Sequence, residues 1–391
     1  MKLAWVSAPP WANTGYGKVT RNFISRIKYP ELISIATGGI QAGPFVEWNG
    51  IKVIPGKQAE VQKGNITLFA LEGILQKEQC THWLFHSDAW AYREMIKQVG
   101  MKYNVILYSP IDGGHVSPEE HQALSIAQER VAMCKYAERE IRKVGLSSTY
   151  IPHGVDTKVF KPMDKSECRE KMGLPKDDFI VGFLGTNISK RKGQAEMMLG
   201  FKKAVDAGKQ FKAILCTDQN GQGVGGYNFW QLADYIGVPR NLMMFPTNAY
   251  EFTEEEMAIM YNSFDIFVNL SRGEGFGIPI LEAEACGVPV IATNFTSMTE
   301  LVDGHGILVP VKALDVYTLK TQYHAIADYD KFGDELIKCI DNADLVKSMG
   351  KRAHKFAQKY DWDKVAPSWD RMFRKIDKQG FFPPYMVKDF K

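Results

Sequence analysis

The sequence has few cysteines, no long uncharged apolar run and almost no net charge. Its six cysteines are widely separated and form no C-x-x-C pair, so neither a zinc site nor a disulfide framework is indicated, and a reducing cytoplasm fits best. No apolar run approaches about 18 residues, so no segment is expected to cross a bilayer, although peripheral contact with a membrane stays open. The formal charge of +3 is too small to argue for sequence-independent DNA binding.

The sequence does contain a repeated alternation of apolar, strand-like runs with amphipathic, helix-like stretches. At 391 residues the chain exceeds what one core usually organises. One series of alternating elements runs from the strand Lys2–Ala8 to Ser148–Ile151, and a second begins at Phe179–Leu184. This pattern predicts an α/β protein with two Rossmann-like, doubly wound domains, residues 1–160 and 170–360.

The carboxyl-terminal stretch Asp344–Lys378 is typical of two helices broken near Tyr360–Asp363. We expect residues 362–391 to pack back on the first domain. Ligands of open α/β sheets bind at the carboxyl ends of the strands, so the two domains are expected to face each other across a central cleft that holds the site.

A glycine-rich segment, Gly273–Glu282, is the strongest functional signal. It follows the apolar strand Asp265–Leu270 and opens a helix at Pro279. Glycines let the backbone approach a ligand closely, and free amides at a helix start suit phosphate or polyol oxygens. Glu274 and Glu282 can line one pocket, where each carboxylate accepts hydrogen bonds from adjacent hydroxyls. The spacing alone is equally compatible with a common strand-to-helix loop whose glutamates are solvated.

The segment GEGFGIPILEAEACGVPVIAT resembles the signature of retaining GT-B glycosyltransferases, especially glycosyltransferase family 4, whose E-x7-E motif Glu274 and Glu282 match. The resemblance extends through YIPHGVDTKVF (150–160), FLGTNISKRKG (183–193) and MYNSFDIFVNLS (260–271), hence through most of the carboxyl half. The amino-terminal half matches only in architecture and short fragments. The resemblance implies an enzyme that moves a hexose from a UDP- or GDP-sugar to a hydroxyl acceptor.

The same resemblance implies roles for individual residues. Glu274 would contact hydroxyls of the donor sugar, and Glu282 the ribose. Lys192, in the basic start of a helix, matches a lysine that clamps the donor diphosphate, with Arg191 assisting; the alternative is a solvated basic turn. Thr186 stands where the family has an arginine, which departs from the usual two-cation clamp. The predicted donor-binding residues are Gly15, Gly17, Lys18, Asn187, Arg191, Lys192, Asn248, Tyr250, Gly275, Phe276, Gly277, Ile278 and Glu282.

Three residues are predicted to be catalytic: Asp112, His86 and Glu274. His86 ends the expected strand Trp83–His86, and Asp112 follows Asn104–Tyr108. Family members often place a histidine or an aspartate at such a strand end, near the anomeric carbon. A lone histidine is also commonly a hydrogen-bonded structural residue, and the Gly15–Lys18 turn has the equally simple interpretation of a tight turn.

No metal and no cofactor besides the nucleotide-sugar co-substrate are expected. The only D-x-D matches, Asp328–Asp330 and Asp361–Asp363, lie in polar segments and resemble helix caps. Several alternatives remain open for the function: a sugar phosphorylase, a nucleotide-sugar epimerase or a sugar-binding module of the same fold, and a glucosyltransferase acting on a modified DNA base. The acceptor, whether glycan, lipid, protein or modified base, is not specified by the sequence, nor is the oligomeric state.

Overall fold

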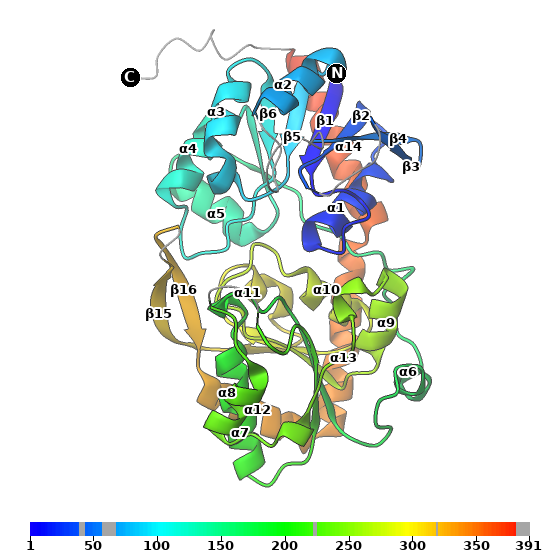
Figure 1. Ribbon diagram of the computed structural model, residues 1–391, viewed down its shortest axis with the longest axis vertical. Helices are drawn as coiled ribbons and strands as arrows, with labels where there is room; N and C mark the ends of the chain where they lie inside the picture. Colours follow the sequence, from blue (N-terminus) through cyan, green and yellow to red (C-terminus); the bar gives the residue numbers. More distant parts are fainter. Residues whose placement is uncertain (39–43, 57–67, 222–224, 318–319, 381–391) are drawn as a thin grey trace. The chain divides into compact units, whose positions relative to one another are not determined.

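The computed structural model in Figure 1 describes residues 1–38, 44–56, 68–221, 225–317 and 320–380. The chain forms two compact units. The first unit comprises residues 1–111, 115–154 and 362–391, and the second comprises residues 112–114 and 155–361. The short segment 112–114 therefore packs with the second unit, although it follows a strand of the first.

The first unit is built on an eight-stranded sheet in the order β3-β4-β2-β1-β5-β6-β7-β8, in which every neighbouring pair is parallel except β3 and β4. The strands are β1 (Lys2–Ser7), β2 (Glu31–Ala36), β3 (Val46–Trp48), β4 (Ile51–Pro55), β5 (His82–Phe85), β6 (Asn104–Leu107), β7 (Glu129–Ala132) and β8 (Thr149–Tyr150). The central strands β1, β5 and β6 are continuous buried runs, as expected for parallel strands covered on both faces.

Helices cover this sheet, and the last of them comes from the end of the described chain (Figure 1). They are α1 (Gly15–Ile24), α2 (Leu68–Lys77), α3 (Arg93–Gly100), α4 (Pro118–Ile126), α5 (Lys135–Lys143), α14 (Trp362–Gln379) and the 3-10 turn η1 (Ala89–Tyr92). Trp369 of α14 is fully buried, with its ring 5.1 Å from Phe23 and 4.8 Å from Tyr108. The predicted return of the final helix to the first unit is confirmed.

The second unit contains a six-stranded parallel sheet in the order β11-β10-β9-β12-β13-β14. Its strands are β9 (Ile180–Leu184), β10 (Lys212–Cys216), β11 (Met243–Met244), β12 (Ile266–Asn269), β13 (Val290–Thr293) and β14 (Ile307–Val309). A separate antiparallel hairpin, β15 (Val311–Tyr317) and β16 (Gln322–Ala327), lies between β14 and the next helix in sequence. This hairpin, together with β2, β3, β4 and β7, was not predicted from the sequence.

The helices of the second unit pack tightly on its sheet and on one another. They are α6 (Lys165–Lys171), α7 (Gln194–Asp206), α8 (Phe229–Ile236), α9 (Glu254–Asn262), α10 (Ile278–Ala285), α11 (Ser297–Val302), α12 (Tyr329–Ile340), α13 (Ala343–Ala357), η2 (Lys190–Lys192), η3 (Arg240–Leu242), η4 (Ala249–Glu251) and η5 (Gln358–Tyr360). A Cβ at Gly200 of α7 would lie 2.1 Å from the Phe332 ring of α12, so the close approach of these helices requires glycine there.

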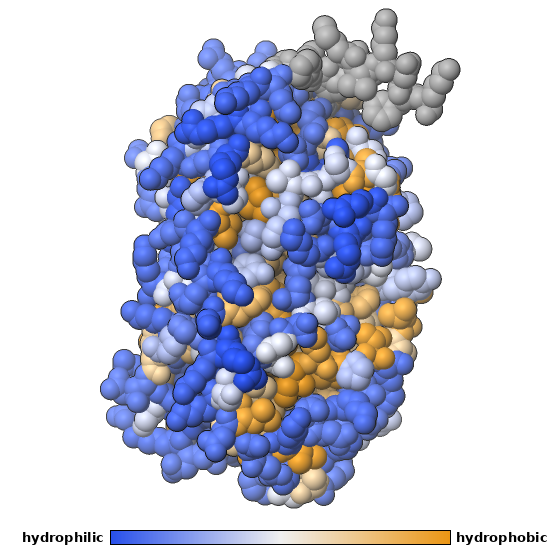
Figure 2. All heavy atoms as spheres, turned by 180° about the vertical axis from the view of Figure 1, so that it is seen from behind, coloured by the Kyte–Doolittle hydropathy of each residue, from blue (hydrophilic) through white to orange (hydrophobic). Residues whose placement is uncertain are grey.

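Figure 2 shows a face of the molecule that is mostly hydrophilic, with its larger hydrophobic area over the second unit. Among the described residues, no helix has both the length and the apolar character that a membrane span requires.

Candidate active site

The loop between β12 and α10 carries the glycine-rich segment. Gly277 precedes the first helical residue with φ +100°, a left-handed conformation that glycine adopts without strain, and Pro279 occupies the first turn. Phe276 is buried beside Tyr360, with ring centroids 6.2 Å apart. The sequence therefore forms a tight, well-packed turn that leads into a helix amino terminus.

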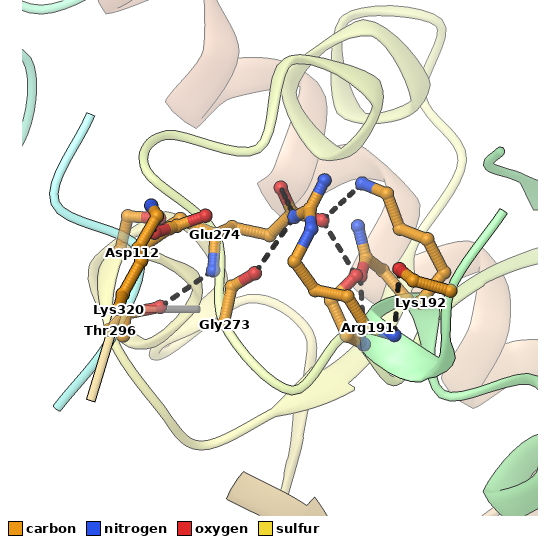
Figure 3. A network of polar contacts seen from close by, with 11 residues as sticks. Asp112, Arg191, Lys192, Gly273, Glu274, Thr296 and Lys320 are labelled. Atoms are coloured by element: carbon orange, nitrogen blue, oxygen red, sulfur yellow. Dashed lines mark hydrogen bonds and ion pairs between the residues drawn. The ribbon is translucent and has the colours of Figure 1, made fainter. Parts of the chain in front are cut away.

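Glu274 is the centre of a polar network in this loop (Figure 3). Its carboxylate accepts hydrogen bonds from Lys192 Nζ at 2.5 Å and Ser271 Oγ at 2.6 Å, and it pairs with Arg191 at 3.3 Å. Its backbone amide donates to Thr296 Oγ1 at 3.0 Å. Since Glu274 is only 7% exposed, these partners fix the side chain in one place.

The cations of this network keep Glu274 ionised. Burial alone would raise the pKa of this carboxyl, but the charges of Lys192 and Arg191, and hydrogen bonds from Lys192 and Ser271, lower it to about 2. Burial in turn lowers the pKa of Lys192, against the opposing effect of Glu274. The site thus holds a buried carboxylate and two cations side by side.

Lys192 and Arg191 come from the 3-10 turn η2, whose position depends on another glycine. Gly193 has φ +67°, and a Cβ there would lie 2.0 Å from the Leu270 carbonyl oxygen. Arg191 also donates to the Gly273 carbonyl at 3.0 Å, while its own carbonyl accepts from the Arg272 amide at 2.7 Å. The basic turn and the glycine-rich loop are therefore joined through their backbones, and the structure brings these predicted residues together.

Asp112 lies against the same loop. A Cβ at Gly273 would be 1.9 Å from the Asp112 carbonyl oxygen, so the two backbones are in direct contact. The Asp112 carboxylate accepts from Lys320 Nζ at 2.6 Å. Burial alone would raise the pKa of Asp112, but Lys320 and Arg191 lower it below its ordinary value. Asp112 and Glu274, both predicted to be catalytic, are thus ionised, and Arg191 lowers the pKa of each.

Other predicted donor-binding residues have their side chains engaged elsewhere in the second unit. Glu282 is buried in α10 and accepts from the Tyr261 hydroxyl at 2.9 Å. Asn187 donates to the carbonyls of Asp218 and Tyr227 and accepts from the Tyr227 amide, so it holds the loop after β10. Asn248 has a left-handed backbone conformation, with φ +54°, directly before η4. The side chain of the predicted residue Tyr250 lies outside the described part of the structure.

The predicted residues of the glycine turn in the first unit form the start of α1. Thr14 caps this helix by accepting from the Gly17 amide at 3.1 Å. A Cβ at Gly17 would lie 2.1 Å from the Ala12 carbonyl oxygen. The Gly17 amide is thus used inside the turn; Gly15 is the first helical residue and Lys18 lies in the first turn, half-buried.

His86, the third residue predicted to be catalytic, lies in an aromatic cluster of the first unit. Its ring packs between Trp5, Tyr16 and Tyr108, and its Nδ1 lies 2.8 Å from the Tyr108 carbonyl oxygen. Burial lowers the pKa of His86 to about 4, so the ring is neutral at pH 7. Its Nε2 is buried and has no hydrogen-bond partner among the residues that the structure describes.

Sequence reasoning missed several residues that complete the site. Ser271 ends the recognised segment 260–271 and Arg272 lies between it and the glycine-rich segment, and neither residue carries a distinctive spacing. Thr296 is the N-cap residue of α11 and Ser297 is its first residue; the Ser297 hydroxyl donates to the Glu274 carbonyl at 2.8 Å. Lys320 belongs to the unpredicted hairpin, and no signal in the sequence pointed to it. Among the described residues, no group of three or more His, Cys, Asp or Glu side chains is arranged to hold a metal ion.

Residues 164–356, about half of the chain and most of the second unit, match the family model for glycosyl transferases group 1. A D-inositol 3-phosphate glycosyltransferase from Segniliparus rotundus is 22% identical over 275 residues, which cover 70% of this chain and 56% of that protein. A protein of the same name from Corynebacterium jeikeium is 27% identical over 238 residues, which cover 59% of this chain and 52% of that protein. The chain spans about half the length of these curated relatives.

Solved structures of the GT-B type share the fold. Sucrose-phosphate synthase from Thermosynechococcus elongatus aligns with a TM-score of 0.77 at 16% identity, covering 97% of this chain and 100% of that one. Anabaena HepE in complex with UDP and glucose aligns with a TM-score of 0.69 at 15% identity, covering 96% and 100%. The fold is therefore GT-B. Together with the matched family, it supports a glycosyltransferase.

Proposed function

We propose that the protein is a retaining glycosyltransferase that moves a hexose from a UDP- or GDP-sugar to a hydroxyl acceptor, without an essential metal or further cofactor. The observation that carries the proposal is the Glu274 network, in which a buried, ionised carboxylate stands between two cations in the loop before α10. A nucleotide sugar offers hydroxyls to such a carboxylate and a diphosphate to such cations. The match to glycosyl transferases group 1 supports the same assignment.

Each side chain in the network then has a role in transfer. Glu274 accepts hydrogen bonds from the donor sugar, while Lys192 and Arg191 bind the diphosphate and stabilise the charge that grows on it as the glycosidic bond breaks. The amides around Phe276, Gly277 and Ile278, at the amino terminus of α10, add a positive dipole. Arg191 supplies the second cation that Thr186 does not.

The reaction itself needs no protein nucleophile. The bond between the anomeric carbon and the diphosphate oxygen breaks, and the acceptor oxygen bonds to the same face of the sugar. The acceptor proton passes to the departing phosphate. The ionised Asp112 stabilises the oxocarbenium-like sugar electrostatically. Glu282 binds the ribose once its hydrogen bond with Tyr261 rearranges.

We place this reaction in a reducing cytoplasm, with peripheral membrane contact as an option for a lipid acceptor. All six cysteines lie in the described residues, are buried and form no disulfide, which is consistent with that setting. The acceptor is one of four classes: glycan, lipid, protein or modified base.

The test is a panel of UDP- and GDP-sugars, scored by thermal stabilisation and by nucleotide release with and without candidate acceptors. We expect at least one sugar nucleotide to stabilise the protein and Glu274→Ala to abolish the effect. Glu255→Ala, which changes an exposed acid on α9, is the matched control and should behave like the wild type. If no sugar nucleotide raises the melting temperature and Glu274→Ala changes nothing, the proposal fails.

The same panel separates the alternatives. Release that depends on a hydroxyl acceptor distinguishes transfer from epimerisation, from phosphorolysis and from binding alone. Retained activity in EDTA supports metal independence, and the anomeric configuration of the product, measured by NMR, tests retention. A DNA-base acceptor is rejected if the protein shows no affinity for duplex DNA at low salt.

A further inference from the structure

The β15–β16 hairpin joins the candidate site to the segment 112–114. The Ala325 amide of β16 donates to the Arg272 carbonyl at 2.8 Å, which ties the hairpin to the glycine-rich loop. Two residues earlier, the Tyr323 carbonyl accepts from the Gly114 amide at 2.8 Å. One strand of the hairpin therefore bonds through its backbone to both parts of the site.

The segment 112–114 is packed so closely that larger residues do not fit at its glycines. A Cβ at Gly113 would lie 2.6 Å from the Gln322 side chain, and one at Gly114 would lie 2.9 Å from Tyr323 Cβ. On the other side, the Asp112 carbonyl touches Gly273. Asp112 is thus held between the hairpin and the loop that carries Glu274.

Lys320 is the charged group that the hairpin brings to this place. Its Nζ lies 2.6 Å from Asp112 Oδ1, and its side chain is only 4% exposed, against 14% for Asp112. Burying a lysine is costly unless its charge is compensated. A surface ion pair contributes little to stability, but removing one partner of a buried pair leaves the other charge uncompensated.

We propose that Lys320 is a positioning residue for glycosyl transfer, which holds the Asp112 carboxylate ionised and fixed beside the glycine-rich loop. The inference rests on the proposed function, in which Asp112 stabilises the reacting sugar. The connection between β15 and β16 that carries Lys320 is then part of the active site.

The electrostatics agree with this geometry. Lys320 is the strongest of the influences that lower the pKa of Asp112, ahead of Arg191, and together they outweigh the effect of burial. A carboxyl with a lowered pKa stays ionised down to a lower pH. Removing Lys320 should therefore raise the pKa of Asp112 and move the loss of its charge to higher pH.

The experiment compares Lys320→Met, Lys320→Arg and Lys312→Met in the full chain. Methionine keeps the length of the buried stem but not the charge, and arginine keeps the charge. Lys312, on β15 of the same hairpin, pairs with the exposed Asp330 and is the matched control. The readouts are kcat and KM for the sugar nucleotide across pH, with thermal unfolding as a check of folding.

For Lys320→Met we expect kcat to fall at least about tenfold, with little change in the donor KM, and the acid limb of the pH profile to move to higher pH. Lys320→Arg should restore the acid limb, and Lys312→Met should match the wild type. Combining Lys320→Met with Asp112→Asn should cost no more than Asp112→Asn alone, because the lysine then has no carboxylate to position.

The outcomes distinguish the inference from the function on which it rests. A wild type inactive with every sugar nucleotide overturns both. An active wild type whose acid limb is the same in Lys320→Met overturns only the role of Lys320. If Lys320→Met does not fold, the pH profiles of Lys320→Arg and Asp112→Asn are compared with that of the wild type. An acid limb of Asp112→Asn that equals the wild-type limb then contradicts the inference.

Discussion

Two buried polar clusters, one in each unit, differ in charge. In the second unit, Glu274 and Asp112 are ionised beside Lys192, Arg191 and Lys320, and both acids have lowered pKa values. In the first unit, one buried polar cluster consists of aromatic rings and histidines with lowered pKa values. Under the proposed function, the cations that would bind the diphosphate therefore belong to the second unit.

The cluster of the first unit consists of His86, Tyr108 and His153. The Tyr108 hydroxyl lies 2.6 Å from His153 Nδ1, and the His86 and His153 rings are 5.3 Å apart. Burial lowers the pKa of His86 to about 4 and that of His153 well below its ordinary value. His86 and His153 are therefore neutral at pH 7. A neutral imidazole can interact with a charge that develops nearby without carrying a charge itself.

The largest expected effect comes from removing a cation of the second unit, which tests whether the charged cluster is needed for activity. Lys192→Met should lower acceptor-dependent nucleotide release by about a hundredfold, because under the proposed function the Lys192 amine stabilises the leaving diphosphate. Lys190→Met, on the same 3-10 turn but exposed, is the control and should change release less than about twofold. Steady-state kinetics with the best sugar nucleotide measure both. Equal effects of the two variants would mean that the turn acts only through its general positive charge.

The second test uses acid to charge the neutral cluster. A histidine whose pKa is lower in the folded state binds fewer protons there than in the unfolded chain, so stability falls as pH drops from about 6.5 to about 4. His86 should contribute on the order of 1 kcal/mol per pH unit across this window. Chemical denaturation of the wild type and His86→Phe should show a shallower pH dependence in the variant. The exposed His121→Gln should retain the wild-type slope; a His86→Phe slope equal to it would show that His86 is not buried as a neutral ring.

The smallest expected effect concerns the neutral cluster of the first unit and tests whether it contributes to stability more than to activity. Tyr108→Phe removes the hydrogen bond to His153 while keeping the packed ring, so the free energy of unfolding should fall by about 1 kcal/mol. Activity should change less than in Lys192→Met, because no charge is lost. Tyr235→Phe, at a ring that is 90% exposed, is the control. A larger loss of activity in Tyr108→Phe than in Lys192→Met would reverse the assignment of roles to the two units.

Much of the fold was predictable because its central strands are continuous apolar runs. The expected strands at Lys2–Ala8 and Phe179–Leu184 appear within a residue or so as β1 and β9, and Asp328 caps α12 as expected. The edge strand β3 and its neighbour β4 were missed because no residue of β3 and only Val53 and Ile54 of β4 are buried, which weakens the hydrophobic signal. The β15–β16 hairpin was missed for a similar reason: most of β15 is exposed.

The site was predictable where residues act from within one motif. Glu274 and the glycines share one turn, and Lys192 follows a strand and opens a helix. The partner of Asp112 was not predictable, since Lys320 lies 208 residues away and meets it only through packing. The engagement of Asn187 with the 218–227 loop likewise depends on tertiary contacts that no local pattern contains.

The β15–β16 hairpin leaves and rejoins the rest of the second unit at a single point. The Asp328 amide, just after β16, donates to the Pro310 carbonyl, just before β15, at 2.8 Å, and Val311 pairs with Ala327. β15 and β16 therefore form a side branch whose two ends meet at the start of α12, and they pair with each other and not with the six-stranded sheet. A change in the length of this branch would act first on the backbone bonds to Arg272 and Gly114, and through Lys320 on the charge beside Asp112.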